Sequence, residues 1–274
     1  MSYLKVATWN VNSVRVRLPQ LLAWLLDARP DVLALQETKV EDAAFPRAEL
    51  EAAGYHTLCC GEKTYNGVAL LSRVPMSDPC FELVPDDPQR RFLAATLAGV
   101  RIVNIYVPNG STVGSDKYAY KLRWLDGLAR HLASARERYQ HMLLLGDFNI
   151  APEDCDVHDP GAWVGSVLVS EPEREWFRRL VRDGWVDLFR AFSTAPGCFS
   201  WWDYRQGAFR RNLGLRIDHI LATPASAACA RSCYIDSLPR RASRPSDHAP
   251  VIAEFARLDT SASGLGRESP DTVQ

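Results

Sequence analysis

Seven polar side chains lie where apolar, strand-like segments end, and together they could hold a metal ion and move protons. For any one of them, a helix cap or a turn is the commoner interpretation. A carboxylate buried alone is costly, however, and strand ends on one edge of a sheet converge in space. We therefore treat them as one candidate set: Asn10, Glu37, Asp147, Asn149, Asp218, Asp247 and His248.

The oxygen-rich composition of this set is typical of a site for a hard divalent cation. Asn, Asp and Glu supply oxygen ligands, and no cysteine accompanies them. Mg²⁺ usually binds one or two protein carboxylates together with phosphate oxygens. The sequence therefore predicts Mg²⁺ as the cofactor, with Mn²⁺ as a substitute.

The run Gly146-Asp147-Phe148-Asn149 permits two local conformations. If the strand continues, Asp147 and Asn149 point to the same face, so that one could activate water while the other donates to a phosphate oxygen. Alternatively, the chain leaves the strand in an Asx turn, which Gly146 would favour.

The run Ser246-Asp247-His248 places a possible metal ligand beside the only side chain that titrates near neutral pH. Adjacent side chains of a strand point in opposite directions, so His248 is expected to pair with another acid, and Asp218 is our candidate. We interpret the remaining histidines as structural: His56, His131, His141, His158 and His219.

Short β-rich runs bounded by Gly, Pro or Asn predict the strands that must position these residues. Apolar positions with a period near 3.6 predict the helices, and Ser170 with Glu173 forms a capping-box pattern. A turn at 98–99 predicts a hairpin. The expected strands are Leu4–Trp9, Asp31–Gln36, Val100–Tyr106, Met142–Leu145, Arg216–Ala222 and Val251–Phe255, and the expected helices are Leu18–Ala28, with Pro19 in its first turn, Lys117–Gln140 and Ser170–Asp183.

Composition indicates a globular chain with ample apolar residues for a core. It has 274 residues, of which 47% are hydrophobic and 24% charged, and no run is long enough to span a membrane. The seven cysteines contain no C-x-x-C pair, so neither disulfides nor a thiolate zinc site is expected. The start lacks a signal-peptide pattern, and we expect a cytoplasmic protein.

A net charge of −1 excludes a globally basic surface, so any polyanion must meet basic residues gathered locally. Aromatic residues interleaved with arginines suit nucleic acid, because rings stack on bases and guanidiniums bind phosphates. The alternative is tryptophans in the core beside a solvated arginine face. The two candidate patches are Trp201, Trp202 and Tyr204 with Arg205, Arg210, Arg211 and Arg216, and separately Arg240, Arg241 and Arg244.

Motifs in chain order from about residue 4 to 255 also carry a family resemblance. They are ATWNVNS (7–13), LALQETK (33–39), TYNGVAL (64–70), NIYVPNG (104–110), LLLGDFNIAP (143–152), SEPEREWF (170–177), FSWWDYR (199–205), LGLRIDHIL (213–221) and RPSDHAPV (244–251). The sequence resembles the exonuclease III family of apurinic/apyrimidinic endonucleases, within a wider endonuclease/exonuclease/phosphatase superfamily. The resemblance implies an α/β fold, a four-layered sandwich of two central mixed β-sheets flanked by helices.

The resemblance also implies a role for each matching residue. Glu37 matches the principal metal ligand, and Asn10, Asp147, Asn149 and Asp247 lie at the other metal-side positions. Asp147 would activate water or protonate the leaving oxygen, and Asn149 would orient the attack. Tyr106 and His248 would contact the phosphate, with Asp218 orienting His248. Expected substrate contacts are Asn12, Asn109 and Arg205, with Trp201, Leu215 and Ile217 around a pocket for a flipped-out abasic sugar.

We therefore expect a metal-dependent DNA repair nuclease that acts as a monomer on double-stranded DNA with an abasic site or a 3′ end. Leu168, a bulky residue before the SEPEREWF segment, could hinder an abasic site inside continuous duplex while admitting a 3′ end. One alternative is a superfamily phosphatase acting on inositol phosphates or lipid head groups, and another is a non-catalytic DNA-binding scaffold. We expect one catalytic domain over residues 1–256 and a disordered tail over 257–274.

Overall fold

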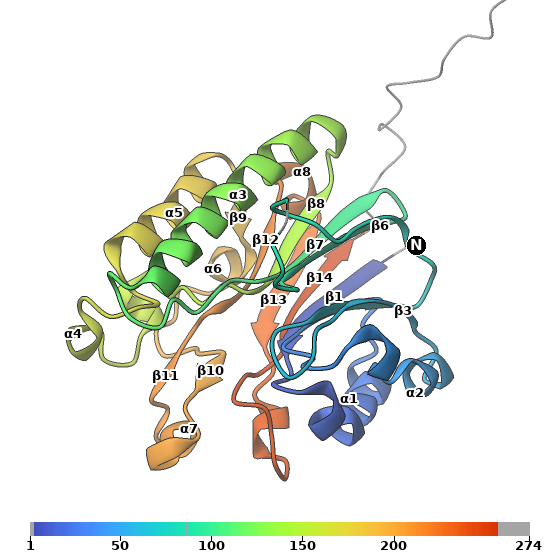
Figure 1. The fold of residues 1–274 in the computed structure, drawn as a ribbon, viewed down its shortest axis with the longest axis horizontal. Coiled ribbons are helices and arrows are strands. Elements are labelled where there is room, and N and C mark those ends of the chain that lie inside the picture. The colour runs from blue at the N-terminus through green and yellow to red at the C-terminus, as the bar shows by residue number, and fades with distance from the viewer. Residues whose placement is uncertain (1–2, 86, 257–274) are drawn as a thin grey trace, which may run out of the picture.

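The computed structural model describes residues 3–85 and 87–256, and it contains two six-stranded sheets packed face to face (Figure 1). Helices cover the outer face of each sheet, so the chain forms four layers. This confirms the predicted fold class. The tail predicted over residues 257–274 lies outside the described residues. Within the described part of the chain, no helix has the length and apolarity needed to cross a membrane.

The first sheet has one parallel pair, β1 with β2, and its other pairs are antiparallel. Parallel neighbours end at the same edge, so β1 and β2 deliver their last residues side by side. In pairing order the strands are β13 (Ala230–Ile235), β14 (Val251–Ala256), β1 (Tyr3–Asn10), β2 (Val32–Gln36), β4 (Val68–Ser72) and β3 (His56–Cys60).

The second sheet repeats this plan with β7 and β8 as its parallel pair. Its strands are, in pairing order, β5 (Ser77–Cys80), β6 (Phe92–Leu97), β7 (Val100–Tyr106), β8 (Met142–Asp147), β12 (Asp218–Ala222) and β9 (Val186–Asp187). A separate two-stranded ribbon joins β10 (Trp201–Trp202) to β11 (Gly214–Leu215).

Four helices supply most of the outer layers. The first sheet is covered by α1 (Val14–Ala28) and α2 (Arg47–Ala52), and the second by α3 (Asp116–Arg138) and α5 (Glu171–Arg182) (Figure 1). The shorter helices are α4 (Pro160–Trp163), α6 (Leu188–Phe192), α7 (Ala208–Arg211) and α8 (Pro224–Ala227), and the 3₁₀ segments are η1 (Asp42–Ala44), η2 (Asp154–Asp156), η3 (Arg205–Gly207) and η4 (Leu238–Arg241).

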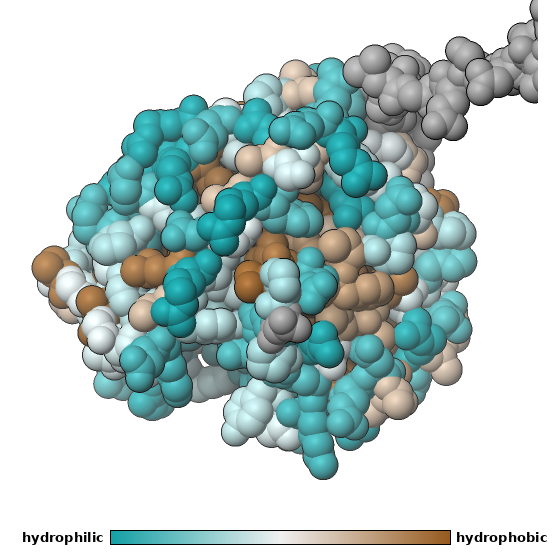
Figure 2. All heavy atoms as spheres, turned by 45° about the horizontal axis from the view of Figure 1, so that its top comes forward, coloured by the Kyte–Doolittle hydropathy of each residue, from teal (hydrophilic) through white to brown (hydrophobic). Residues whose placement is uncertain are grey.

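Apolar residues fill three interfaces between the four layers. Val6, Ile102 and Leu143 belong to the cluster between the sheets. Trp24 of α1 packs in the cluster under the first sheet, and Leu128 of α3 packs in the cluster over the second. Figure 2 shows hydrophilic residues over most of one face, with apolar residues exposed near its middle. Burial of these three clusters fixes the distance and angle between the sheets.

Most predicted boundaries agree with the observed ones. The turn at 98–99 joins β6 to β7, and the capping box of Ser170 and Glu173 opens α5 as expected. The prediction for the first helix was wrong at its start. This helix begins at Val14, so Pro19 lies inside it and not in its first turn.

Candidate active site

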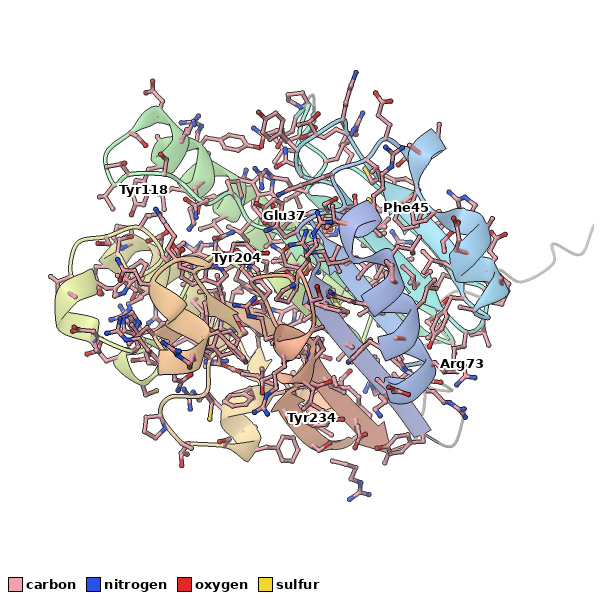
Figure 3. The ribbon with its side chains drawn as sticks, turned by 90° about the horizontal axis from the view of Figure 1, so that it is seen from below. Glu37, Phe45, Arg73, Tyr118, Tyr204 and Tyr234 are labelled. Atoms are coloured by element: carbon pink, nitrogen blue, oxygen red, sulfur yellow. The ribbon has the colours of Figure 1, made fainter. Side chains whose placement is uncertain are left out.

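The strand ends of both sheets meet at one edge of the sandwich. Asn10 ends β1, Tyr106 ends β7, Asp147 ends β8, and Glu37 follows β2 directly. Asp218 begins β12, which runs antiparallel to β8, and its register places Asp218 opposite Asp147. Figure 3 looks along the molecule from below and shows Glu37 near the middle of this end.

An amide links the carboxylates of the two sheets. Asn10 Nδ2 donates to Glu37 Oε1 at 2.8 Å and to Asp147 Oδ2 at 2.9 Å. Ligand atoms of Glu37, Asp147 and His248 all lie within 4.8 Å of one another. The two carboxylates supply oxygen ligands at a spacing that fits a divalent cation.

His248 and Asp218 form a buried pair beside this group. His248 Nδ1 lies 2.9 Å from Asp218 Oδ2, and its Nε2 lies 3.8 Å from Asp147 Oδ2. Burial alone lowers the pKa of His248, but the charges of Asp218 and Asp147 outweigh it and raise that pKa. Burial raises the pKa of Asp147, against the opposing charge of His248. The pairing of His248 with Asp218, predicted from strand alternation, is therefore present.

The turn after β8 brings Asp147 and Asn149 together. Gly146 has a φ of 146°, and a Cβ there would lie 2.0 Å from Ile105 O, so the position requires glycine. The strand ends at Asp147, and Asn149 N donates to Asp147 Oδ1 at 2.9 Å, which makes an Asx turn. Asn149 Nδ2 also reaches Asp147 Oδ2 at 3.3 Å. Of the two conformations that the sequence permits, the Asx turn is the one found, and it also brings the two side chains together.

Tyr106 and Asn109 border the same group. Burial, followed by the negative charge of Glu37, raises the pKa of Tyr106 well above its ordinary value, so its phenol stays protonated and can donate a hydrogen bond. The Arg91 guanidinium lies 4.5 Å from the centre of the Tyr106 ring. Asn109, which is exposed, donates from Nδ2 to Asn149 Oδ1 at 3.2 Å.

Asp247 lies beside the carboxylate group, held by two side chains. Asn12 Nδ2 donates to its Oδ1 at 2.9 Å, and Trp201 Nε1 donates to its Oδ2 at 3.0 Å. Burial acts to raise the pKa of Asp247, but the charge of His248 and these two hydrogen bonds lower it overall. Of the described residues, the close group of possible ligands contains Glu37, Asp147 and His248 but not Asp247.

Lys39 is a site residue that sequence reasoning missed. Its Nζ lies 2.8 Å from Glu37 Oε2 and also donates to Asn12 Oδ1. The signal was available, because Lys39 follows Glu37 by two positions in the LQETK segment. An ammonium group there offsets part of the excess negative charge of the site.

Apolar residues form a wall next to these polar groups. Leu168, Leu215 and Ile217 are buried in one cluster against the half-buried Trp201. Leu168 has a φ of 78°, a conformation that costs energy for a branched residue. Glu37, Asn12 and Asn149 also have positive φ, so backbone strain gathers around this site.

The predicted arginine surface is wrong at two positions. Arg216 is buried, with Nε 2.6 Å from Asp156 Oδ1 and Nη2 2.8 Å from Asp187 Oδ2. Arg240 is buried too and lies 5.0 Å from the centre of the Phe209 ring. Arg216 pairs with acids distant in sequence, whereas Arg240 lies among aromatic rings and donates to Ser246 O. The arginines of these patches that are exposed are Arg205, Arg210, Arg211, Arg241 and Arg244.

Of the aromatic residues predicted beside those arginines, Trp202 is buried, whereas Tyr204 is about half exposed. Trp202 packs against Phe209, with 5.0 Å between the ring centres. Arg205 donates to the carboxylate of its neighbour Asp203. The aromatic part of the predicted surface is therefore Tyr204 with part of Trp201, and Trp202 belongs to the core.

Comparison with known proteins identifies the family of this chain. A model of the endonuclease/exonuclease/phosphatase family matches residues 7–248. The chain is 36% identical to exodeoxyribonuclease III of Haemophilus influenzae over 92% of this chain and 100% of that one.

Two solved structures share the fold over most of the chain. The 3′ phosphatase NExo from Neisseria, bound to a product DNA hairpin, matches with a TM-score of 0.91, 46% identity and coverage of 93% of this chain and 100% of that one. An AP endonuclease from Archaeoglobus fulgidus matches with a TM-score of 0.89, 41% identity and coverage of 92% and 99%. The chain therefore belongs to the endonuclease/exonuclease/phosphatase family.

Proposed function

We propose that this protein is a metal-dependent DNA repair nuclease that hydrolyses phosphodiester bonds at abasic sites or at 3′ ends. The observation that carries the proposal is the convergence of Glu37, Asp147 and the His248–Asp218 pair at one edge of two sheets. Support comes from relatives whose names describe exodeoxyribonuclease, 3′ phosphatase and AP endonuclease activities. A scaffold without activity would be expected to lack some of the acids, and each is present.

The chemistry required is the attack of water on phosphorus in line with the leaving oxygen. Asp147, buried and with a raised pKa, is suited to exchange a proton with the water or the leaving oxygen. Asn149, hydrogen-bonded to Asp147, orients the attack. His248, kept cationic by Asp218, neutralises charge on the phosphate. Tyr106, whose phenol stays protonated, donates a hydrogen bond to a phosphate oxygen.

Mg²⁺ is the proposed cofactor, with Mn²⁺ as a substitute. Glu37 would be the principal ligand, with Asn10, Asp147, Asn149 and Asp247 on the same side of the site. When bound, such an ion supplies positive charge beside the phosphate and lowers the pKa of coordinated water. The carboxylates that crowd this edge are the chemical reason to expect a cation.

The surface beside the site has features expected for DNA binding. A cavity of about 600 Å³ adjoins Asn109 and is lined by Tyr65, Arg91, Lys117 and Tyr120. Cationic side chains can bind the phosphates along a nucleic-acid strand, and aromatic rings can stack on the bases or sugars of that strand. On the other side, Asn12 contacts Tyr204, and Arg205 is exposed. We propose that DNA binds across both sides.

Leu168 is proposed to set the balance between substrates. It packs with Trp201, Leu215 and Ile217, the residues proposed to enclose an abasic sugar. A smaller residue would open space for a sugar flipped out of continuous duplex. We expect Leu168→Ser to raise cleavage at an internal abasic site relative to release of a 3′-terminal phosphate. Unchanged relative rates would refute this role.

A substrate panel tests the proposed function. Purified protein with Mg²⁺ is given an internal abasic site, a 3′-phosphate and a plain recessed 3′ end. We expect hydrolysis of at least one DNA substrate, loss of it with a chelator, and recovery on adding Mg²⁺. Hydrolysis of inositol phosphates but of no DNA would support the phosphatase alternative. Inactivity on every substrate with Mg²⁺ and with Mn²⁺ would support the scaffold.

A monomeric state and a cytoplasmic location complete the proposal. Sedimentation at micromolar concentration checks the first, with the mass of one 30.7 kDa chain as the expected result. A fusion to a fluorescent protein checks the second.

A further inference from the structure

A buried ion pair lies next to the segments that carry Asn109 and Asn149. Lys121 of α3 and Glu173 of α5 form a salt bridge, and both side chains are 0% exposed. Removing two charges from water costs several kcal/mol per ion, and well-packed apolar residues of similar volume are often as stable. Stability of the fold is therefore a weak reason for this pair.

The contacts of Lys121 lead to the site. Its Nζ donates to Asn149 O at 2.7 Å and to Asn109 O at 3.2 Å, in addition to the bridge with Glu173. An ammonium group has three protons, and three acceptors surround this one. Both carbonyls belong to irregular segments, which follow β7 and β8.

The contacts of Glu173 lead to the pocket wall. Its Oε1 accepts from Leu168 N at 3.1 Å, and its Oε2 accepts from Ser170 N at 3.0 Å. Leu168 O in turn accepts from Ala151 N at 2.7 Å, and this hydrogen bond connects the loop of Leu168 to the segment that follows Asn149. The loop of Leu168 and the turn of Asn149 are thus tied to one buried pair.

Close packing holds Lys121 in this position. Gly110 has a φ of 93°, and a Cβ there would lie 3.1 Å from Lys121 Cδ and 3.1 Å from Val167 Cγ2. Tyr118, one turn before Lys121 on α3, has its hydroxyl 2.6 Å from Ser170 Oγ. The lysine therefore has little freedom to adopt another rotamer.

We propose that Lys121 is a positioning residue that fixes the backbones of Asn109 and Asn149, and that Glu173 extends this control to the loop of Leu168. The inference rests on the proposed function, because it assigns Asn149 a part in the reaction. A displacement of about 1 Å in a reacting group can reduce turnover by about 10²-fold. Among the described residues, the hydrogen bonds that tie the pair to the site run to the backbones of Asn109, Asn149 and Leu168.

The test compares Lys121→Met with Leu128→Ala. Leu128 lies on the same helix, fully buried in the cluster between α3 and the second sheet, so it controls for loss of stability. We expect Lys121→Met to lower kcat by about 10²-fold, with KM for DNA within about threefold. Leu128→Ala should lower Tm as much or more while leaving kcat per folded molecule within about twofold.

Hydrogen exchange provides a readout that does not depend on activity. Lys121→Met should lose protection in the segments 107–111 and 149–152, and Leu128→Ala should not. Equal exchange in these segments, or equal kcat in the two variants, would overturn the proposal. If the wild type hydrolyses no DNA while Lys121→Met still loses protection in these two segments, the proposed function is refuted. That outcome would nevertheless support the positioning of the two backbones by Lys121.

Glu173→Gln provides a milder variant in case Lys121→Met does not fold. The amide keeps the volume and one acceptor, but it loses the charge and one of the two acceptor positions. We expect exchange to increase over 167–170 and the ratio of abasic cleavage to 3′-phosphate release to change at least threefold. No change in either measurement would overturn the link to the Leu168 loop.

Discussion

Two buried polar clusters lie close together in this molecule, and they differ in charge balance. Around Arg216, the acids Asp156 and Asp187 face the cations Arg216 and Arg190, so charges match. At the strand ends, the acids Glu37, Asp147, Asp218 and Asp247 face Lys39 and His248. An excess of buried acid is costly unless a cation is supplied.

The hydrogen bonding of Arg216 and of Asp218, the central residues of the two clusters, also differs. All three nitrogens of the Arg216 guanidinium have partners, including both oxygens of Asp156. In the other cluster, Asp218 Oδ1 is buried and has no hydrogen-bond partner among the described residues. Arg190 Nε of the first cluster is also buried without a partner among the described residues, so the two clusters differ in charge balance and not in the completeness of their hydrogen bonds. The comparison teaches that an excess of buried charge of one sign indicates a site for a bound ion of the opposite sign, whereas a balanced cluster such as that of Arg216 can be structural.

The largest expected effect is on stability, at the balanced cluster. Arg216→Met leaves Asp156 and Asp187 buried without their cation and should lower the free energy of unfolding by about 3–5 kcal/mol. Urea unfolding followed by tryptophan fluorescence measures this. The matched control is Arg205→Met, because Arg205 is exposed and only its neighbour Asp203 is affected, so no change is expected. Equal stability of the two variants would contradict the comparison.

At the unbalanced cluster the effect should fall on activity. Glu37→Gln removes a proposed metal ligand and one excess charge, so kcat should fall by about 10²–10³-fold while Tm stays equal or rises. Mg²⁺ at 100 times its Kd should stabilise the wild type by about 2.7 kcal/mol and the variant much less. Asp27→Asn, an exposed change on α1, is the control. A large loss of Tm in Glu37→Gln would show that this cluster, too, is structural.

Sequence reasoning succeeded for residues whose position follows directly from the strand that precedes them. Parallel strands must end at one edge of their sheet, so Asn10 and Glu37 after β1 and β2, and Tyr106 and Asp147 at the ends of β7 and β8, lie together in pairs. The assignment of Arg216 failed for a physical reason. Whether an arginine is solvated or buried depends on its partners, and Asp156 lies 60 positions away along the chain. Lys121 was missed for the same reason, since a lysine on a helix gives no sign of the carbonyls it reaches.

The pH dependence of stability at His219, which contacts Arg216 of the balanced cluster, provides a further test of the comparison. Its Nδ1 lies 2.9 Å from Arg216 Nη1 and its Nε2 lies 2.9 Å from Ile150 O, so the neutral ring accepts from the first and donates to the second. Burial and the charge of Arg216 lower its pKa from 6.5 to about 4. The unfolded chain then binds a proton that the folded chain excludes. The stability of the folded state is therefore unaffected by the titration of His219 above pH 6.5, and it decreases as the pH falls toward 4, because protons then bind the unfolded chain first.

His219→Gln should remove that part of the pH dependence. Over this window the wild type should lose about 1.4 kcal/mol of stability per pH unit more than the variant, until the pH nears the folded pKa. Subtracting the two curves cancels the carboxylates, which titrate in both proteins. Parallel curves would mean that His219 carries its proton in the folded state.

The smallest expected effect tests whether activity depends on the hydroxyl that orients Asp218 in the unbalanced cluster. Ser200 Oγ donates to Asp218 Oδ2 at 2.6 Å and accepts from the amide nitrogens of Ile217 and Asp218 at 3.1 and 3.0 Å. Ser200→Ala leaves every charge in place but releases the acid that orients His248. A hydrogen bond to a charged group contributes about 1.5–3 kcal/mol, so a fall in kcat of about tenfold is expected if half of that is used in orientation.

Ser226→Ala is the matched control for that change. Ser226 is equally buried, but it bonds Thr223 and His141 at the far end of β12 and should leave kcat unchanged. If Ser200→Ala also leaves kcat unchanged, Asp218 is held by His248 and its own backbone alone. The unbalanced cluster would then depend on its charges and not on the hydroxyl that orients them.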